Sequence, residues 1–463
     1  MEFIDEAYIN LLLNDKSLND EVFQLEVIEK AGEAKGLNIK ESAALLNITS
    51  HEIVEKLFHT AKEIKEKIYG NRLVMFAPLY ITNLCVNNCL YCAFRRDNKE
   101  LIRKALSLDE IREETEYLVS QGHKRILLVA GETPGKPALQ YMGEAIDVMY
   151  KVNVNNGNIR RINVNSAPLS VEDFKTLKSF GIGTYQCFQE TYHFDTYKIM
   201  HPGGPKSDYP WRLYAVDRAL QAGIEDVGIG SLFGLTDYRF ETLALLSHAF
   251  NLDSKYGIGP HTMSVPRLEP ALNAPVANHP PYAVDDASFK KLVAVIRLAV
   301  PYTGIILSTR EKAELRRELF TVGISQISAG SRTSPGAYKE SETISGNKEM
   351  EQFQLGDHRS LDEVVKDCFR LGYLPSFCTA CYRSLRTGDR FMELAKIGNI
   401  GKICVPNALA TFKEYLIDFA SDETKLKGEE FLKLQIEKES ETSKKKVANM
   451  INRVESGERD VFF

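Results

Sequence analysis

Residues 72–94, RLVMFAPLYITNLCVNNCLYCAF, consist of an apolar, β-rich run followed closely by three cysteines. These are Cys85, Cys89 and Cys92, at the spacing C-x3-C-x2-C. In a chain far longer than the small disulfide-rich secreted domains, clustered cysteines indicate metal or redox chemistry. The stretch therefore predicts a strand that ends in a metal-binding loop.

Seven further apolar runs follow this one, separated by amphipathic segments with helical spacing. They are RILLVAGE (125–132), RINVNSAP (161–168), TYQCFQETY (184–192), DVGIGSLFGL (226–235), HTMSVPRLEP (261–270), GIILSTR (304–310) and ISQISAGS (324–331). Among the helical segments, 107–122 opens with a capping box of Ser107 and Glu110, and 170–181 closes on Gly181. Eight nearly continuous apolar strands predict an α/β fold with a complete, closed (β/α)8 barrel, because such strands are covered on both sides. An open, doubly wound sheet is the alternative.

The rest of the chain is predicted to be helical. Residues from about 18 to 69 carry apolar side chains at three- and four-residue spacing. Residues 331–360 are polar, and the chain beyond them turns helical. We therefore expect an N-terminal helical extension (1–71), the barrel (72–331) and a mostly helical C-terminal domain (332–463).

The composition is that of a globular protein acting on small molecules. The chain has 463 residues, 44% hydrophobic and 26% charged, with a formal net charge of -5 and no long block of like charge. This argues against nucleic acid and anionic membranes as partners. The first residues are acidic, and no apolar run approaches the length of a membrane span, so we expect a cytoplasmic location.

The first cysteine triplet favours an iron-sulfur cluster. Structural zinc takes four protein ligands, whereas this loop offers three cysteines and no neighbouring histidine. Three cysteines on a 4Fe-4S cubane leave one iron with an open coordination site. Zinc is kept as the alternative.

The spacing, the aromatic Tyr91 before the last cysteine and the position after the first strand resemble the radical S-adenosylmethionine (SAM) superfamily. The resemblance implies that the open iron binds the amine and carboxylate of SAM, and that one-electron reduction releases a 5'-deoxyadenosyl radical. LLVAGE, ending in Gly131 and Glu132, is similar to the GGE element of that superfamily. The SAM contacts that the resemblance implies come from Tyr91, Gly131, Glu132, Ser166, Glu190 and Arg212. For Arg212, an exposed position on a helix is the alternative.

A second cysteine triplet lies near the C-terminus. Cys378, Cys381 and Cys404 have the spacing C-x2-C-x22-C and predict a second cluster with an open iron. The alternative is a zinc site that takes Cys368 as its fourth ligand. Cys368 falls in a helical pattern, and we expect both Cys368 and Cys187 to be core residues.

CVNNCLYCAFRRDN, FQETYH, HPGGPKSDYPWR, GPHTMSVPRLEP and ISAGSRTSPGAY resemble the aromatic amino acid lyase branch of the superfamily, and the resemblance spans about residues 20 to 420. This branch contains two families of tyrosine lyases, the 2-iminoacetate synthases of thiamine thiazole biosynthesis and FeFe-hydrogenase maturases. The second triplet matches the maturases and is absent from the synthases. The resemblance thus implies cleavage of L-tyrosine at Cα-Cβ to p-cresol and dehydroglycine, and conversion of dehydroglycine to carbon monoxide and cyanide. The carbon monoxide and cyanide would form an Fe(CO)2(CN)(cysteine) unit for the hydrogenase H-cluster. The alternative function for the chain is that of a 2-iminoacetate synthase.

The same resemblance implies further site residues and partners. Tyrosine would place its carboxylate on Arg310, assisted by Ser328, with Glu190 also at the catalytic centre; for Arg310 an exposed helical ion pair is the alternative. His261 precedes the sixth strand, at the opposite rim of the barrel, where it would bind an additional iron that also carries free L-cysteine. The two clusters should then lie roughly 20 Å apart, at opposite ends of one strand length. An electron donor such as a ferredoxin or flavodoxin and other hydrogenase maturases complete the expected partners.

Overall fold

The computed structural model describes residues 3–133, 135–340 and 349–463. Its centre is a barrel of eight parallel strands, one for each apolar run of the sequence. The strands are β1 (Arg72–Thr82), β2 (Arg125–Ala130), β5 (Arg161–Asn165), β6 (Tyr185–Gln186), β7 (Val227–Gly230), β8 (Thr262–Ser264), β9 (Gly304–Leu307) and β10 (Gln326–Ser328).

The barrel is closed by parallel pairing between its first and last strands. Val74 of β1 pairs with Gln326 of β10, and Phe76 pairs with Ser328. Most strand residues are buried, as expected for strands that have the barrel interior on one side and helices on the other. The closed barrel is confirmed, and the open doubly wound sheet is wrong.

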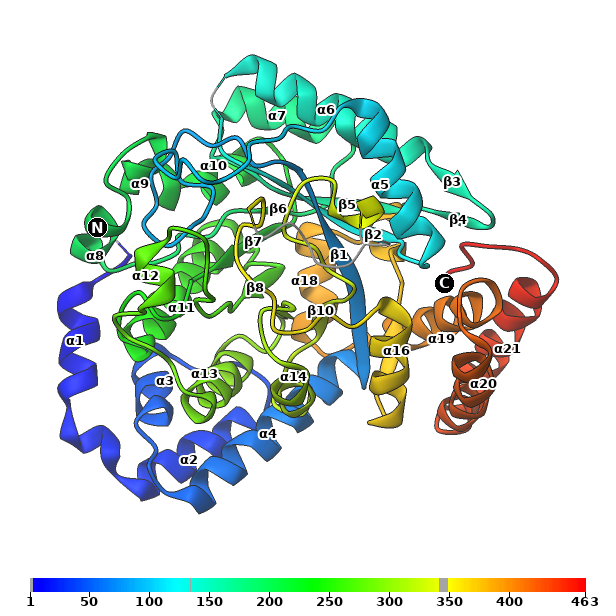
Figure 1. Ribbon diagram of the computed structural model, residues 1–463. Coiled ribbons are helices and arrows are strands. Elements are labelled where there is room, and N and C mark those ends of the chain that lie inside the picture. Colours follow the sequence, from blue (N-terminus) through cyan, green and yellow to red (C-terminus); the bar gives the residue numbers. More distant parts are fainter. Residues whose placement is uncertain (1–2, 134, 341–348) are drawn as a thin grey trace.

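Helices surround the strands in a ring (Figure 1). Two of the sequence signals for their ends are present: the side chain of Ser107 accepts from Glu110 N in a capping box, and Gly181 follows the seventh helix with φ of 76°. These helices are α5 (Leu108–Ser120), α6 (Lys136–Lys151), α7 (Val171–Ser179), α8 (Phe194–Met200), α9 (Tyr209–Leu213), α10 (Ala215–Gln221), α11 (Tyr238–Tyr256), α12 (Pro275–Asn278), α13 (Asp286–Ala299) and α14 (Ala313–Phe320). Two short elements between strands complete this part, a 3-10 helix η2 (Pro205–Ser207) and a hairpin of β3 (Asn153–Val154) and β4 (Gly157–Asn158).

The N-terminal residues form helices that pack on the outside of the barrel helices α11 and α13 (Figure 1). They are α1 (Glu6–Asn14), η1 (Lys16–Asn19), α2 (Glu21–Ala31), α3 (Ile39–Leu46) and α4 (His51–Tyr69). Helix α1 begins before residue 18, where the sequence analysis placed the first helix. The boundary at residue 71 stays a prediction.

The C-terminal residues are mostly helical, but they also add a ninth strand that the sequence analysis did not predict. This strand, β11 (Leu374–Ser376), pairs in parallel with the beginning of β1, so that Arg72 lies opposite Leu374. The helices are α15 (Ala337–Glu340), α16 (Leu361–Arg370), α17 (Ala380–Arg383), α18 (Gly388–Lys396), α19 (Gly401–Asp418), α20 (Asp422–Glu437) and α21 (Glu441–Glu455). Residues 341–348 of the polar stretch lie outside the described residues.

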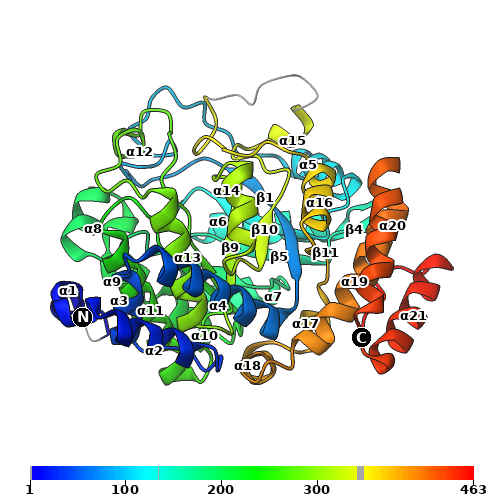
Figure 2. The same ribbon diagram turned by 90° about the horizontal axis from the view of Figure 1, so that it is seen from below.

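Figure 2 shows α12 at one end of the barrel and α17 and α18 at the other. The loops after the strands, including the first cysteine loop, lie at the α12 end. The second cysteine triplet belongs to the α17 end. None of the helices in the described part of the chain is long and apolar enough to cross a membrane.

Candidate active site and second cysteine site

A cavity of about 200 Å³ lies at the C-terminal end of the barrel strands. We call it the upper cavity. All but one of the residues predicted for SAM or tyrosine binding line it, together with the first cysteine triplet. The lining residues from the prediction are Cys85, Cys89, Cys92, Tyr91, Gly131, Glu132, Glu190, Arg212, Arg310 and Ser328.

The cysteine loop is fixed by close backbone contacts with the loop that follows β2. Gly131 N donates to Thr82 O, and Val86 N donates to Glu132 O. A Cβ atom on Gly131 would lie 2.2 Å from Leu84 O, so only glycine allows this approach. The glycine of the GGE-like element therefore has a packing role in holding the cysteine loop.

Asn87, which lies between the first two cysteines, joins three segments of the site. Its Nδ2 donates to Glu132 Oε2 at 2.7 Å, and its Oδ1 accepts from Lys206 N at 2.8 Å. Gly204, in the HPGGPK segment, has φ of 92°, and a Cβ there would lie 2.5 Å from Asn87 Oδ1. The sequence analysis did not single out Asn87.

The chemistry of the three thiols fits a cationic metal cluster. Burial raises the pKa of Cys89 to about 12 and that of Cys92 to about 11, so both thiols need a positively charged partner to ionise. Gln352 Nε2 lies 3.6 Å from Cys92 Sγ as a donor. Hydrogen bonds to cysteine sulfur are typical of iron-sulfur sites. Among the described residues, no group of three His, Cys, Asp or Glu side chains could hold a single metal ion.

Two buried ion pairs stand beside these cysteines. Arg212 Nη1 lies 2.7 Å from Glu132 Oε1, and Lys206 Nζ lies 2.6 Å from Glu190 Oε1. Burial by itself would raise the pKa of Glu132, but Arg212 and Lys206 outweigh this effect and hold the pKa below its usual value. Arg212 is 5% exposed, so the exposed alternative for this residue is wrong.

Glu190 adopts a backbone conformation that is unusual for a residue with a side chain. Its φ is 73°, in the left-handed region. Glu190 O accepts from Leu232 N at 2.8 Å, which holds this conformation between β6 and β7. Strain of this kind persists where the surroundings fix it, and it concentrates at functional sites.

Tyr91 is positioned by a buried histidine. Its hydroxyl lies 2.7 Å from His201 Nε2, and His201 Nδ1 lies 2.8 Å from Tyr197 O. Burial lowers the pKa of His201 well below its usual value, so the ring is neutral. A neutral ring whose Nδ1–H donates to Tyr197 O must accept at Nε2, so Tyr91 donates the hydrogen bond.

Arg310 lies in the wall of the upper cavity directly after β9. Its guanidinium packs 3.2 Å from the ring centroid of Phe353, and within the described residues it has no carboxylate partner in an ion pair. Ser328 Oγ accepts from Thr309 N at 3.1 Å. The guanidinium of Arg310 therefore faces a cavity with hydroxyl groups beside it and no anionic partner. Such a group is suited to bind the carboxylate of a ligand. The exposed alternative for Arg310 is wrong.

Ser166 is the one predicted SAM contact that does not line the upper cavity. It lies in a neighbouring cavity of about 270 Å³ between β2, β5, α6 and α7. Glu132, Lys206 and Arg212 line both cavities and separate them. The cofactor role of Ser166 stays a prediction.

A second cavity, of about 50 Å³, lies at the opposite end of the barrel. We call it the lower cavity. Cys378, Cys381 and Cys404 line it together with His261, as the sequence analysis expected. Cys378 precedes the short helix α17, Cys381 is the second residue of that helix, and Cys404 lies in the first turn of α19.

His261 has the surroundings of a metal-binding histidine. Its Nδ1 lies 3.6 Å from Asp226 Oδ1, and its Nε2 lies 3.1 Å from the hydroxyl of Tyr382. Burial lowers the pKa of His261 to about 4, which keeps the ring neutral. Nδ1 is buried without a hydrogen-bond partner, and a neutral imidazole in a cavity lined by three thiols is a suitable iron ligand. The residues of the lower cavity therefore fit iron, with the pKa of Cys381 raised to about 12 by burial in the absence of a metal.

The two remaining cysteines are core residues. Cys368 on α16 is fully buried and does not line the lower cavity, and Cys187 is buried beside Tyr185. The zinc site that takes Cys368 as a fourth ligand finds no support in this geometry.

Sequence analysis missed several polar residues of both sites. Lys206 and Gln352 line the upper cavity, and Arg72 and Arg125 line the lower one. Each of the two arginines is the first residue of an apolar strand run, which was the only signal in the sequence. Gln352 comes from beyond residue 331, within the stretch assigned to the C-terminal domain.

A (β/α)8 barrel with a C-x3-C-x2-C loop after its first strand, beside a GGE-like turn, defines a radical SAM enzyme. The family model for the radical SAM superfamily matches residues 79–246, and that of the biotin and thiamin synthesis associated domain matches residues 264–374. A superfamily member of this kind holds a 4Fe-4S cluster and SAM.

Comparison with solved structures and relatives shows which family of the superfamily the chain belongs to. A crystal structure of HydG, a maturase of the FeFe-hydrogenase, is 50% identical with a TM-score of 0.95, covering 100% of both chains. HydG from Carboxydothermus hydrogenoformans is 43% identical with a TM-score of 0.85, covering 97% of this chain and 99% of the other. The 2-iminoacetate synthase of Escherichia coli (strain K12) is 30% identical over 80% of this chain and 93% of its own length. The chain belongs to the HydG family of radical SAM proteins.

Proposed function

We propose that the chain is a tyrosine lyase that makes carbon monoxide and cyanide for FeFe-hydrogenase maturation. It would cleave L-tyrosine at Cα-Cβ to p-cresol and dehydroglycine, and convert dehydroglycine at the second site into carbon monoxide, cyanide and water. Two such conversions would supply one Fe(CO)2(CN)(cysteine) unit and release one cyanide. The observation that carries this proposal is the pairing of two three-cysteine cavities at opposite ends of one barrel. The likeness to HydG over the full chain supports it.

In the upper cavity, Cys85, Cys89 and Cys92 would hold the 4Fe-4S cluster that binds SAM. When bound, the cluster and SAM supply a 5'-deoxyadenosyl radical that removes hydrogen from the tyrosine amino group. The protein holds the SAM amine and carboxylate through Gly131, Glu132 and Arg212. Tyr91 and Glu190 shape the wall beside them, and the predicted contact from Ser166 belongs to the same proposal.

Arg310 and Ser328 would position the substrate. The guanidinium of Arg310 offers two parallel donors to the tyrosine carboxylate, and Ser328, whose Oγ accepts from Thr309 N, lines the cavity next to it. Barrel side chains line the cavity, and their exclusion of water from bound tyrosine would protect a radical from side reactions.

In the lower cavity, Cys378, Cys381 and Cys404 would hold a second 4Fe-4S cluster. His261 would bind the additional iron, and free L-cysteine would complete its ligands. Dehydroglycine would travel from the upper to the lower cavity through the barrel. The additional iron leaves with the product and is therefore a substrate of the reaction.

A 2-iminoacetate synthase is the second candidate, favoured by the identity of 30% to that enzyme. Such an enzyme would use the upper cavity alone. The lower cavity with its three thiols and His261 has no role in that reaction, which makes the maturase the better proposal.

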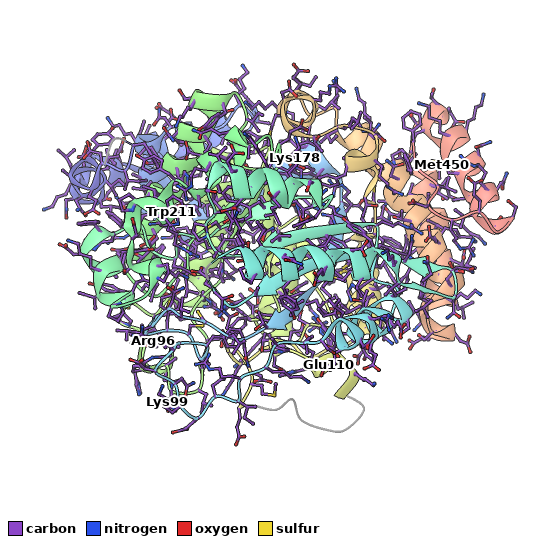
Figure 3. The ribbon with its side chains drawn as sticks, turned by 90° about the horizontal axis from the view of Figure 1, so that it is seen from above. Arg96, Lys99, Glu110, Lys178, Trp211 and Met450 are labelled. Atoms are coloured by element: carbon purple, nitrogen blue, oxygen red, sulfur yellow. The ribbon has the colours of Figure 1, made fainter. Side chains whose placement is uncertain are left out.

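An electron donor would approach the first cluster from the outer side of the cysteine loop. Arg96 and Lys99 are exposed on this loop, at the edge of the molecule (Figure 3). Arg96 pairs with Asp97, and Glu100 is exposed beside Lys99, so the loop carries charges of both signs. A ferredoxin or flavodoxin as the electron donor is therefore proposed from the family likeness. Other hydrogenase maturases would receive the product.

The test is anaerobic incubation of the reconstituted protein with L-tyrosine, SAM, L-cysteine, ferrous iron and dithionite. We expect p-cresol, cyanide and carbon monoxide, and infrared bands of iron-bound carbon monoxide and cyanide. Formation of p-cresol with glyoxylate and without cyanide would identify the 2-iminoacetate synthase instead.

A further inference from the structure

Three neighbouring barrel strands begin with a buried arginine. These are Arg72 of β1, Arg125 of β2 and Arg161 of β5, with exposed fractions of 8%, 7% and 2%. Arg125 and Arg161 are register partners in the sheet, and β1 pairs with β2. Ala77 of β1 pairs with Ile126 of β2, so Arg72 lies four residues further toward the N-terminal end than Arg125. This end of the barrel therefore carries three guanidinium groups on the side of the second cysteine triplet.

Only one of these arginines has a protein anion as its partner. Arg161 lies 3.6 Å from Asp226 Oδ2, donates to Thr184 Oγ1 and packs on the ring of Tyr382. Arg72 and Arg125, by contrast, take part in no ion pair within residues 3–133, 135–340 and 349–463. In both, Nε is buried without a hydrogen-bond partner.

Arg72 and Arg125 both line the lower cavity. Arg125 Nη2 donates to Cys378 O at 2.9 Å, so its guanidinium is fixed against the cysteine loop. Arg72 packs over the ring of Tyr69, which lies in the same cavity wall. A buried guanidinium without an anion is costly, so both groups indicate an anionic occupant of this cavity.

The cluster alone does not balance these charges. Arg161 is paired with Asp226, so the positive charges of Arg72 and Arg125 are left without a protein carboxylate in the cavity. An oxidised cubane core held by three thiolates carries one net negative charge, and an additional ferrous iron brings more positive charge. One guanidinium or more is therefore left for a further anion.

We propose that Arg72 and Arg125 form a carboxylate subsite next to the second cluster. The planar guanidinium matches a carboxylate in a forked pair, and two such groups that line the same cavity can bind the oxygens of one small ligand. This proposal deepens the proposed function and rests on it. The ligand is an α-amino or α-imino acid, and its two sources are the free L-cysteine on the additional iron and the dehydroglycine from tyrosine cleavage.

In this role the two arginines are positioning residues. The carboxylate is held at the rim of β1 and β2 while the other end of the ligand points toward Cys378, Cys381 and His261. The rest of the ligand would then face the residues that would hold the iron in one orientation.

The test measures binding and needs no turnover. L-cysteine is titrated into the reconstituted protein carrying both clusters, with the electron paramagnetic resonance signal of the second cluster as the readout. Cysteamine, which keeps the thiol and amine but lacks the carboxylate, is titrated in parallel. We expect L-cysteine to bind about tenfold tighter or more, the effect of a hydrogen-bonded charged group.

Arg72→Met and Arg125→Met should each remove this preference by weakening L-cysteine and leaving cysteamine unchanged. Arg383→Met is the matched control, because Arg383 ends helix α17 next to the second cysteine triplet, pairs with Asp460 and does not line the cavity. It should keep the preference. Glyoxylate is the stable carbonyl counterpart of dehydroglycine. If glyoxylate competes with L-cysteine, the subsite also binds the cleavage product. If glyoxylate does not compete, the subsite binds free cysteine alone.

The preference for L-cysteine over cysteamine decides the outcome. If it survives in both methionine variants, the proposal is wrong. A second result would also make the proposal wrong. In it, the iron content falls by half in both methionine variants, Arg72→Lys and Arg125→Lys restore the iron content, and neither the wild type nor any variant prefers L-cysteine to cysteamine. The arginines would then only neutralise the charge of the cluster. The formation of p-cresol is measured separately at the upper site, so failure of the lyase proposal is distinguished from failure of the subsite.

Discussion

Arg212 on α9 and Glu132 after β2 form a buried ion pair, with 2.7 Å between Nη1 and Oε1, between the upper cavity and its neighbour. The two residues are 80 positions apart in the chain. The pair therefore links the fourth strand-helix unit to the second, beside the first cysteine loop.

Removing one partner of this pair should destabilise the fold. Arg212→Met leaves the carboxylate of Glu132 buried with a weaker cationic environment, which costs about 3–5 kcal/mol for a buried pair. The double variant Glu132→Gln/Arg212→Met should recover most of this loss. The measurement is anaerobic urea unfolding, with Arg218→Met as the control, because Arg218 donates to backbone oxygens and forms no ion pair among the described residues. Equal losses in the single and double variants would contradict the prediction.

The first cysteine triplet should be needed for tyrosine cleavage, and the second only for the formation of the iron-bound product. Cys378→Ala or Cys381→Ala should keep p-cresol formation and abolish iron-bound carbon monoxide and cyanide, because only the lower cavity changes. Cys89→Ala should abolish both. Iron content checks the loading, at about four per chain for one cubane and about eight or more for two. Loss of p-cresol in the Cys378 and Cys381 variants would show that tyrosine cleavage depends on the second site.

Arg310 should select for the carboxylate of tyrosine. Arg310→Met should lower kcat/KM for tyrosine by roughly 10- to 100-fold, the cost of a lost charge-assisted hydrogen bond. Binding of tyramine, which lacks the carboxylate, should be almost unchanged. The comparison is made by the release of p-cresol and by competition between the two compounds. A matching loss of affinity for tyramine would mean that Arg310 acts through packing on Phe353.

Gly131→Ala should disrupt the first cluster and spare the second. An added Cβ would meet Leu84 O at 2.2 Å and push the cysteine loop away from the turn after β2. We expect iron after reconstitution to fall from about eight to about four per chain. Gly372→Ala serves as a control for the chain near the second site, where a Cβ meets no atom within 4 Å, although its φ of 85° makes this control mildly strained.

His123 should weaken the fold in mild acid. Burial lowers the pKa of His123 to about 3, whereas the unfolded chain has a pKa of about 6.5. A lowered pKa means that the unfolded chain takes up the proton first, so stability is full above pH 6.5 and falls as the pH drops toward 3. The free energy of unfolding should lose about 1.4 kcal/mol at pH 5.5. His123→Gln should remove this part of the pH dependence, and His279→Gln, at an exposed position, should not.

The sequence predicted the barrel well because its strands are buried on both faces and read as apolar runs. It did not predict β11, since a three-residue strand with Pro375 at its centre lies between helical segments and looks like a turn. The cysteines and His261 could be placed because their types and order identify them. Arg72, Arg125 and Lys206 could not, because arginine and lysine are usually exposed. Their burial depends on segments that pack on them from other parts of the chain.

β1 carries the framework of both sites. Its first residues pair with β11, which leads two residues later to Cys378, and its last residue is followed three positions later by Cys85. From Val74, the partner of Ser376, to Thr82 the strand rises about 27 Å. The length of this one strand thus sets the distance between the two metal-binding loops. A single residue inserted in the middle of β1 would turn the side chains beyond it to the opposite face of the sheet, and it would also lengthen the distance between the two loops. Natural variation in this strand should therefore be confined to substitution, without insertion or deletion.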